Sequence, residues 1–162
     1  MSTLRVRRSI HTRSSVTVRP ARMKDSARIA ELSCELGYPV SAKRMRDCMT
    51  TVLKRSAQKM FVADVDGIVE GWVEVFLPHS VLNWGKAEVG ALIVGSKTRG
   101  HGLGQALLDA ARRWSEQRKS QFVYLRSNIK RKDAHRFYKR AGYKIHKTQF
   151  VFQLVLDKKR KG

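Results

Sequence analysis

The sequence predicts a mixed α/β domain, and three stretches carry that prediction. Asp66-Gly67 separates two β-rich runs, which is the strongest short-range signal for a β-hairpin. A glycine-punctuated loop over residues 99–104 joins an apolar run to a helix-patterned stretch. A further β-rich run over residues 121–126 follows that helix, and strand, helix, strand at this spacing implies a right-handed parallel crossover.

A length of 162 residues suits one domain with a single core. Residues 1–15 hold four arginines and no acidic residue, so we expect a basic flexible N-terminal extension, followed by one domain over residues 16–162. The same composition is typical of a mitochondrial transit peptide. The extension lacks the apolar core of a secretory signal, which makes the cytoplasm the default location. No apolar run approaches the roughly 20 residues that span a bilayer, so we expect no membrane partner.

The net charge is +21, from 34 Lys and Arg against 13 Asp and Glu. A field of this sign attracts anions such as coenzyme A, nucleic acid or acidic surfaces, and it disfavours polycationic substrates. Because the charge is spread along the chain, we interpret most of it as solvated surface. Nucleic-acid contact is compatible with this charge but not favoured.

The N-terminal elements follow from local signals. Residues 16–19 alternate like a strand and meet Pro20, and Asp25 is placed to cap a helix that ends near Gly37. Ser41 opens a second helix. Both helices carry an apolar face, given by Ile29, Leu32 and Leu36 in the first and by Met45, Cys48, Met49 and Val52 in the second. Cys34 and Cys48 have no metal-ligand spacing and are predicted to be small core or half-buried side chains.

The second half of the chain predicts the remaining elements in order. The hairpin strands are residues 60–65 and 68–76, and the loop over 78–85 places Trp84 either at a substrate-facing edge or as a half-buried aromatic. A strand over 88–94 comes next, and then a helix from Leu103 to Lys119 with an Asp109–Arg113 pair on its outer face. A strand over 121–126 and a short helix around 134–141, ended by Gly142, follow. The last predicted elements are strands over 143–147 and 148–156.

The glycine loop has the features of a phosphate cradle. Glycine lets the backbone approach an anion and point its N–H groups at it, and the helix that follows adds the positive end of its dipole. A P-loop needs Lys-Ser or Lys-Thr after its last glycine, but Gln105-Ala106 follows Gly104. A dinucleotide fingerprint needs a glycine where Gln105 stands.

What fits instead is Arg99, Gly102 and Gly104 between a strand and a helix, which resembles the pyrophosphate loop of the GNAT superfamily of acetyl-CoA-dependent N-acetyltransferases. A second stretch strengthens the resemblance, which spans residues 16–156, with Asn128 followed by Ala134, Phe137-Tyr138 and Gly142-Tyr143. It implies a mostly antiparallel twisted sheet, with a central parallel strand pair splayed around the cofactor and helices on its flanks.

The resemblance also implies residue roles, with acetyl-CoA as cosubstrate and no metal. Glu88 is the expected base or water-positioning residue, or alternatively a strand carboxylate paired with an arginine. Tyr138 is the expected proton donor to the departing thiolate, or alternatively a core aromatic. The expected cofactor-binding residues are Leu92, Ile93 and Val94 through their backbone, the loop Arg99, Gly100, His101, Gly102, Leu103, Gly104 and Gln105, and Asn128, Ala134, Phe137 and Tyr138.

The predicted function is N-acetyl transfer from acetyl-CoA to a primary amine. No cysteine lies near the cradle in sequence, so we expect direct transfer without an acyl-enzyme. The acceptor is a small molecule or a protein amine, with the small molecule slightly favoured. The alternative is a basic module of the same fold that binds coenzyme A or nucleic acid without turnover. A homodimer is compatible with the resemblance.

Overall fold

The computed structural model describes residues 15–83 and 85–156. The predictions for residues 1–14 and for Trp84 therefore lie outside the described residues. The chain divides into two compact units, Met1–Arg126 and Ser127–Gly162. The boundaries predicted for the extension and for a single domain stay predictions.

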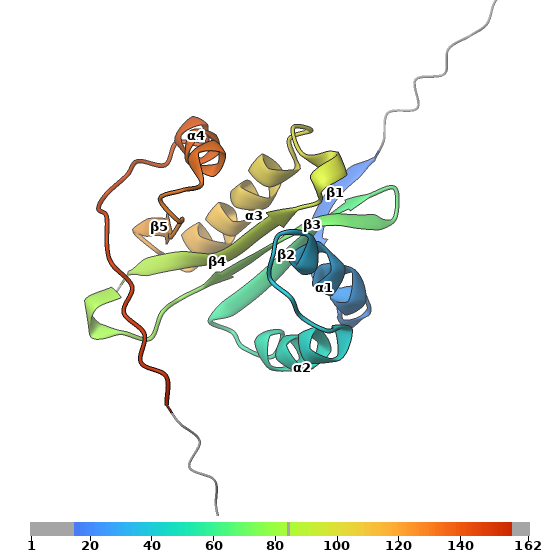
Figure 1. Cartoon of the computed structure of the whole chain (residues 1–162), viewed down its shortest axis with the longest axis horizontal. Helices are drawn as coiled ribbons and strands as arrows, with labels where there is room; N and C mark the ends of the chain where they lie inside the picture. The colour runs from blue at the N-terminus through green and yellow to red at the C-terminus, as the bar shows by residue number, and fades with distance from the viewer. Residues whose placement is uncertain (1–14, 84, 157–162) are drawn as a thin grey trace, which may run out of the picture. The chain divides into compact units, whose positions relative to one another are not determined.

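The first unit is built on a five-stranded sheet in the order β1-β2-β3-β4-β5 (Figure 1). The strands are β1 Val16–Pro20, β2 Gln58–Val65, β3 Ile68–Phe76, β4 Lys86–Val94 and β5 Phe122–Leu125. Neighbouring strands are antiparallel except β4 and β5, which are parallel as predicted. The predicted hairpin is confirmed, and both Asp66 and Gly67 have the positive φ that its tight turn requires.

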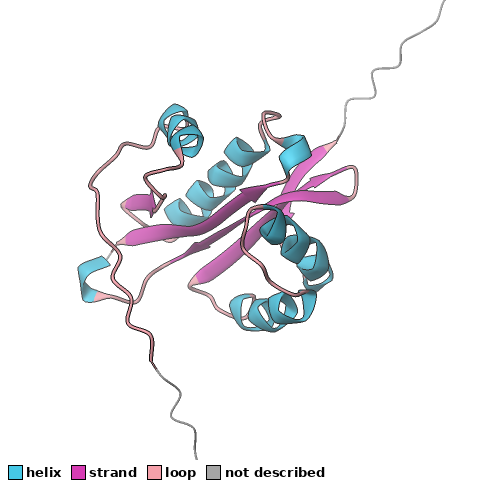
Figure 2. Ribbon diagram, viewed as in Figure 1, coloured by secondary structure: helices cyan, strands magenta, loops and turns pink. Residues whose placement is uncertain are grey.

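Helices cover both faces of this sheet (Figure 2). The helices α1 (Ser26–Glu35) and α2 (Ala42–Val52) pack on one face, where Ile29, Leu32 and Met49 meet Trp72 and Ile93 in one buried cluster. The long helix α3 (Leu103–Gln117) covers the other face with Leu107, Ala110 and Trp114, as the spacing predicted. Three short 3-10 helices complete this unit, at η1 Met23–Asp25, η2 Val81–Asn83 and η3 Ser96–Thr98.

Asp25 does not cap α1 with its side chain, which corrects one prediction. Its buried carboxylate instead accepts hydrogen bonds from the Arg19 guanidinium at 2.8 and 3.0 Å, and Arg19 also reaches Asp64. Burial alone would raise the pKa of Asp25, but Arg19 and the Arg22 N–H hold it below its ordinary value. Ser41 does cap α2, because its hydroxyl accepts from the Arg44 N–H at 3.1 Å.

Two side-chain predictions in this unit are wrong. Cys34 and Cys48 are exposed rather than packed in the core, because α1 and α2 turn those positions to solvent. Asp109 pairs with Arg112 at 3.9 Å rather than with Arg113, because positions three apart also share a helix face.

The second unit contains α4 (Lys132–Arg140), and the glycine predicted to end this helix, Gly142, follows it with a φ of 91°. The strands predicted over residues 143–147 and 148–156 are not formed, and side chains such as Phe150 and Phe152 are 89 and 92% exposed. Alternation measures the propensity for a strand, but a strand forms only with a partner to pair with. Within the described residues the sheet therefore ends at β5, and the parallel pair predicted to be central lies at its edge. In that same part of the chain, no helix has the length and apolar character to cross a membrane.

Candidate active site

The pairing of β4 with β5 stops halfway along β4, where β5 ends. Toward β3 the register slips by one residue, so Gly90 bulges out of the ladder. Toward β5 the pairing stops at Val89, opposite Leu125. In the described residues, the β5 side of Leu92–Val94 is thus left without a ladder partner. Backbone groups at this opening can hydrogen-bond an extended ligand arm, as predicted for these residues.

Glycine is required at the bulge because two side chains from β3 crowd it. A Cβ on Gly90 would lie 2.9 Å from Phe76 Cε1 and 3.1 Å from Glu74 Oε2. Both distances are shorter than normal carbon contacts, so any larger residue would displace these side chains. The opening of the strand pair therefore lies directly beside Phe76 and Glu74.

The glycine loop follows the end of β4 and has the geometry of an anion cradle. Gly100 and Gly102 both have a φ of 82°, which favours glycine, and a Cβ on either would meet no atom within 4 Å. Helix α3 begins directly afterwards, and its hydrogen-bond ladder starts only at Ala106 N–H to the Gly102 carbonyl, 3.0 Å. The N–H groups of Leu103, Gly104 and Gln105 therefore have no intrahelical acceptor. Free N–H groups at the start of a helix are typical of an anion site, and the role of this loop toward a pyrophosphate stays a prediction.

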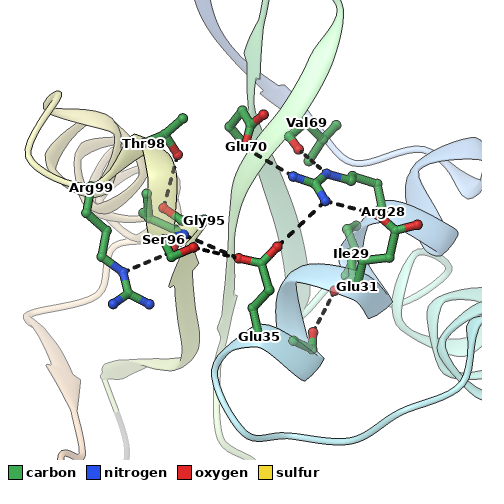
Figure 3. A network of polar contacts seen from close by, with 12 residues as sticks. Arg28, Ile29, Glu31, Glu35, Val69, Glu70, Gly95, Ser96, Thr98 and Arg99 are labelled. Carbon is green, nitrogen blue, oxygen red and sulfur yellow. Dashed lines mark hydrogen bonds and ion pairs between the residues drawn. The ribbon is translucent and has the colours of Figure 1, made fainter.

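The start of this loop is fixed by α1 and β3 (Figure 3). Glu35 Oε2 accepts from the Ser96 N–H at 3.3 Å and from its hydroxyl at 3.4 Å, and the Gly95 N–H donates to the Glu70 carbonyl at 2.8 Å. Arg28 lies 3.2 Å from the Glu70 carboxylate and 3.8 Å from Glu35. The network ties the cradle to two rigid elements before any ligand binds.

Three predicted cofactor-binding side chains make local contacts instead of pointing at one site. Arg99 Nε donates to the Val94 carbonyl at 3.3 Å, and Gln105 Nε2 donates to Asp109 at 3.2 Å. His101 Nδ1 lies 3.0 Å from the Arg99 carbonyl, within the loop. All three side chains are exposed, so their predicted role rests on reorientation toward the anion.

Glu88 lies on the strand that leads to the cradle, as predicted, and is 7% exposed. Its Oε2 accepts from the Tyr124 hydroxyl at 2.6 Å and from Arg126 Nη2 at 3.1 Å. Burial and the adjacent carboxylate raise the pKa of Tyr124, so this hydroxyl stays a donor at neutral pH. The pairing with Arg126 matches the structural alternative for Glu88, and its role as base stays a prediction.

Glu74 is a candidate that the sequence reasoning missed. It is half-buried, accepts from Gln58 Nε2 at 2.5 Å and lies beside the Gly90 bulge. Burial raises the pKa of Glu74 despite the hydrogen bond from Gln58. Glu74 lies on the half-buried face of β3, whose fully buried positions are Val73 and Val75, so the alternation along the strand gave no clear signal for it.

The remaining predicted residues belong to the second unit. The Asn128 side-chain oxygen accepts from the Lys130 N–H at 2.9 Å. Ala134, Phe137 and Tyr138 are half-buried on α4, and the Phe137 and Tyr138 rings lie 5.3 Å apart. Tyr138 also lies edge-on to Tyr143 at 6.1 Å. Their roles toward a cofactor stay predictions, as does metal independence: across residues 15–83 and 85–156 no group of three His, Cys, Asp or Glu side chains is placed to hold a metal ion.

A parallel strand pair, β4 and β5, with a glycine loop between β4 and helix α3, is the arrangement that the sequence resemblance predicted. Comparison with known proteins supports the same family. The model of the acetyltransferase (GNAT) family matches residues 26–143. The chain belongs to this family. The matched range includes β4, the cradle and α4, so the resemblance inferred from the motifs is confirmed.

One curated relative of this GNAT protein is the aminoalkylphosphonate N-acetyltransferase of Salmonella typhimurium. It is 38% identical over 88 residues, which make up 54% of this chain and 55% of the relative. The chain thus spans about half the length of the relative it matches.

Solved structures confirm the fold. Aminoglycoside N-acetyltransferase AAC(6')-Iy in complex with CoA has a TM-score of 0.81 at 14% identity, over 90% of this chain and 98% of that one. Glucosamine-6-phosphate N-acetyltransferase from Arabidopsis thaliana has a TM-score of 0.73 at 16% identity, over 87% of this chain and 99% of that one.

Proposed function

We propose that this GNAT protein transfers the acetyl group of acetyl-CoA directly to the primary amine of a small molecule. The observation that carries the proposal is the end of the β4–β5 pairing at Val89, with the glycine loop at the start of α3 following β4 and η3 along the chain. An extended arm would bind along the β5 side of Leu92–Val94, and the pyrophosphate would bind at the glycine loop. The cofactor supplies an activated acetyl thioester.

Three groups of this chain take part in the proposed reaction, two by transferring a proton and one by stabilising negative charge on the carbonyl oxygen. Glu88 accepts the proton of the amine, directly or through a water molecule, as the new C–N bond forms. A backbone N–H of Leu92–Val94 donates to the carbonyl oxygen, a kind of interaction whose removal costs about 2.7–4 kcal/mol in other enzymes. Tyr138 donates its proton to the sulfur as the C–S bond breaks.

The remaining predicted residues would hold the cofactor. The amides of Gly102, Leu103 and Gly104 would bind the pyrophosphate, with Arg99 and Gln105 beside it. Asn128 would bind the pantetheine amides. The exposed cysteines lie on α1 and α2, away from this loop in sequence, which favours direct transfer over an acyl-enzyme.

A small-molecule acceptor is supported by the curated relative, which is named for acetylating an aminoalkylphosphonate. A protein amine is the competing acceptor. Assays with free small amines and with a lysine-containing peptide, each at matched concentration, distinguish the two. Faster acetylation of the peptide would overturn the small-molecule assignment.

The second candidate function is a module that binds coenzyme A or nucleic acid without turnover, and the net charge of +21 favours it. Nucleic-acid affinity would then fall steeply with salt, because each phosphate contact releases a counterion. Tight binding with this salt dependence, together with no acetylation of any amine, would support the module.

The deciding experiment is isothermal titration of acetyl-CoA into the intact protein and into Gly102→Glu. We expect micromolar binding by the intact chain and none by the variant, because the carboxylate would occupy the cradle. Absence of binding by the intact protein would refute the acetyltransferase proposal. Glu88→Gln and Tyr138→Phe then test the proton transfers, since each should lower kcat while cofactor affinity stays within about twofold.

We also propose a cytoplasmic location and a homodimer. The exposed apolar side chains between residues 150 and 156 favour association of two copies. Light scattering coupled to size-exclusion chromatography measures the mass directly. A monomer at micromolar concentration would exclude the dimer.

A further inference from the structure

A groove of about 630 Å³ lies in the first unit, outside the predicted cofactor surface. It is formed between the loop that connects α2 to β2 and the segment that follows β3. Its walls are residues 54–58 on one side and 76–79 on the other. This volume is typical of small-molecule sites.

The outer wall of the groove is cationic. Lys54, Arg55 and His79 are exposed there, while no Asp or Glu occurs among the described residues that line it. An arginine and a lysine side by side suit a phosphonate or carboxylate, since a guanidinium can donate two parallel hydrogen bonds to two oxygens. The groove therefore favours an anionic group at its outer end.

The inner wall leads to a carboxylate. Gln58 and Phe76 line the groove, are half-buried and face each other across the β2–β3 ladder. Gln58 Nε2 donates to Glu74 at 2.5 Å, and Glu74 and Phe76 both flank the Gly90 bulge. Glu74 is thus one side chain away from the groove and next to the opening of β4. An ammonium group at this end would lie beside Glu74, next to the Gly90 bulge of β4.

The walls are fixed without a ligand. The Leu77 N–H donates to the Ala57 carbonyl at 2.8 Å, which joins the two sides. Arg118 donates to the Ser56 carbonyl at 3.1 and 3.2 Å, and its guanidinium stacks 4.4 Å from the Trp114 ring centre. Because the loop is already held, a ligand would not have to order it, which lowers the entropic cost of binding.

We infer that this groove is the acceptor site and that the acceptor is a zwitterionic amine, with its anionic group bound by Lys54 and Arg55 and its ammonium directed to Glu74. The inference rests on the proposed function, because a bound amine is an acceptor only if the protein transfers an acetyl group to it. Binding of the zwitterion in the groove does not depend on that reaction. Lys54 and Arg55 at the outer end of the groove match the anionic group of such a molecule, and the carboxylate of Glu74 beyond its inner end matches the ammonium. His79 adds a further donor at the anionic end.

The test compares 2-aminoethylphosphonate with propylamine, which lacks the anionic group. Arg55→Gln and Lys54→Gln should each raise KM for 2-aminoethylphosphonate about tenfold, while KM for propylamine and for acetyl-CoA stays within about twofold. Lys43→Gln is the matched control. It removes one positive charge from an exposed pair with Asp47 on α2, outside the groove, and should leave every KM unchanged.

The amine end is tested by Glu74→Gln, which keeps the size of the side chain. We expect KM to rise for both amines, with KM for acetyl-CoA unchanged. β-Alanine in place of 2-aminoethylphosphonate distinguishes a carboxylate from a phosphonate acceptor. Equal KM effects of Arg55→Gln on 2-aminoethylphosphonate and on propylamine would overturn the inference.

Calorimetry separates the inference from the proposed function. 2-Aminoethylphosphonate is titrated into the protein saturated with coenzyme A, without turnover. Binding that Arg55→Gln and Lys54→Gln abolish would support the groove even if no amine is acetylated. Acetylation of amines together with binding of the phosphonate that is insensitive to both substitutions would refute the groove and leave the acetyltransferase proposal intact.

Discussion

Gly102→Ala and Gly37→Ala form a matched pair that separates the shape of the cradle from the stability of the chain. Gly102 has a φ of 82° and Gly37 a φ of 88°, and a Cβ at either position would meet no atom within 4 Å. The two substitutions therefore introduce the same methyl group into the same backbone conformation. Only Gly102 lies in the cradle, at the N-cap of α3.

The loss of stability follows from the backbone alone. A non-glycine residue in the left-handed region costs about 1–2 kcal/mol in the folded state. Alanine also restricts the unfolded chain, which returns about 0.4–1 kcal/mol. The net destabilisation is about 1 kcal/mol for each variant, which corresponds to a fall in Tm of about 2–4 °C for a chain of this size.

The effect on coenzyme binding should differ between the two variants. A methyl group on Gly102 enters the open space in front of the first amides of α3, where the pyrophosphate would approach. Loss of one charge-assisted hydrogen bond costs about 1.5–3 kcal/mol, so the affinity of Gly102→Ala for coenzyme A should fall at least about tenfold. Gly37→Ala, which is far from the cradle in sequence, should bind within twofold of the intact protein.

Differential scanning calorimetry gives the two Tm values, and isothermal titration with coenzyme A gives the two affinities. Equal loss of affinity in both variants would mean that general destabilisation, rather than cradle shape, weakens binding. Unchanged affinity in Gly102→Ala would refute the assignment of the pyrophosphate to this loop.

Three further substitutions test the frame that holds the site. Arg19→Ala leaves the buried carboxylate of Asp25 unpaired and should cost about 3–5 kcal/mol by urea unfolding. The folded-state pKa of Asp25 lies below its ordinary value, so the ion pair stabilises the fold above the ordinary pKa. This stabilisation is lost as the pH falls through the folded-state pKa. The stability of the variant should therefore depend less on acid pH than that of the intact protein. The folded-state pKa of Glu74 is raised, so ionisation of this carboxyl costs stability as the pH rises. Glu74→Gln should therefore raise Tm at pH 7. This advantage should disappear below pH 4.5, the ordinary pKa of the group. Gly71→Ala should cost about 1–3 kcal/mol in urea unfolding, because its Cβ would lie 2.9 Å from the Ile93 carbonyl oxygen, a backbone atom, and 3.1 Å from Leu107 Cδ1.

The elements that local chemistry determines were predictable from the sequence. The Asp66-Gly67 turn requires positive φ at both residues, and the structure has it. The apolar spacing of α3 placed Leu107 and Trp114 in the core correctly. The segment after Tyr143 differs, because its alternation records propensity alone and carries no information about a partner strand. Asp25 differs for a related reason, since its partner Arg19 is on another element and competes with the helix end.

Some features of the candidate site were likewise predictable from the sequence, and others were not. The glycine loop between a strand and a helix was predictable because its signals lie in adjacent residues, and Gly100 and Gly102 have positive φ there, while its role as an anion cradle stays a prediction. The role of Glu74 was not readable, because it depends on a bulge at Gly90 and a hydrogen bond from Gln58, 16 positions away. Burial and cross-strand contacts decide such a residue, and neither is local in sequence.

The distribution of acidic residues bears on the two proposed anion sites, the cradle and the groove, in a chain with a net charge of +21. With 13 Asp and Glu against 34 Lys and Arg, few carboxylates are available, and several of them hold the frame together. Arg19 and Arg28 between them pair with the carboxylates of Asp25, Asp64, Glu31, Glu35 and Glu70. Two guanidiniums against five carboxylates leave these clusters with a formal charge of 2 − 5 = −3, so the positive field of the chain comes from its other Lys and Arg side chains. The attraction proposed for anionic ligands at the cradle and at the groove therefore depends on those other cations, and the ion pairs of Arg19 and Arg28 serve to hold the sheet and the helices together.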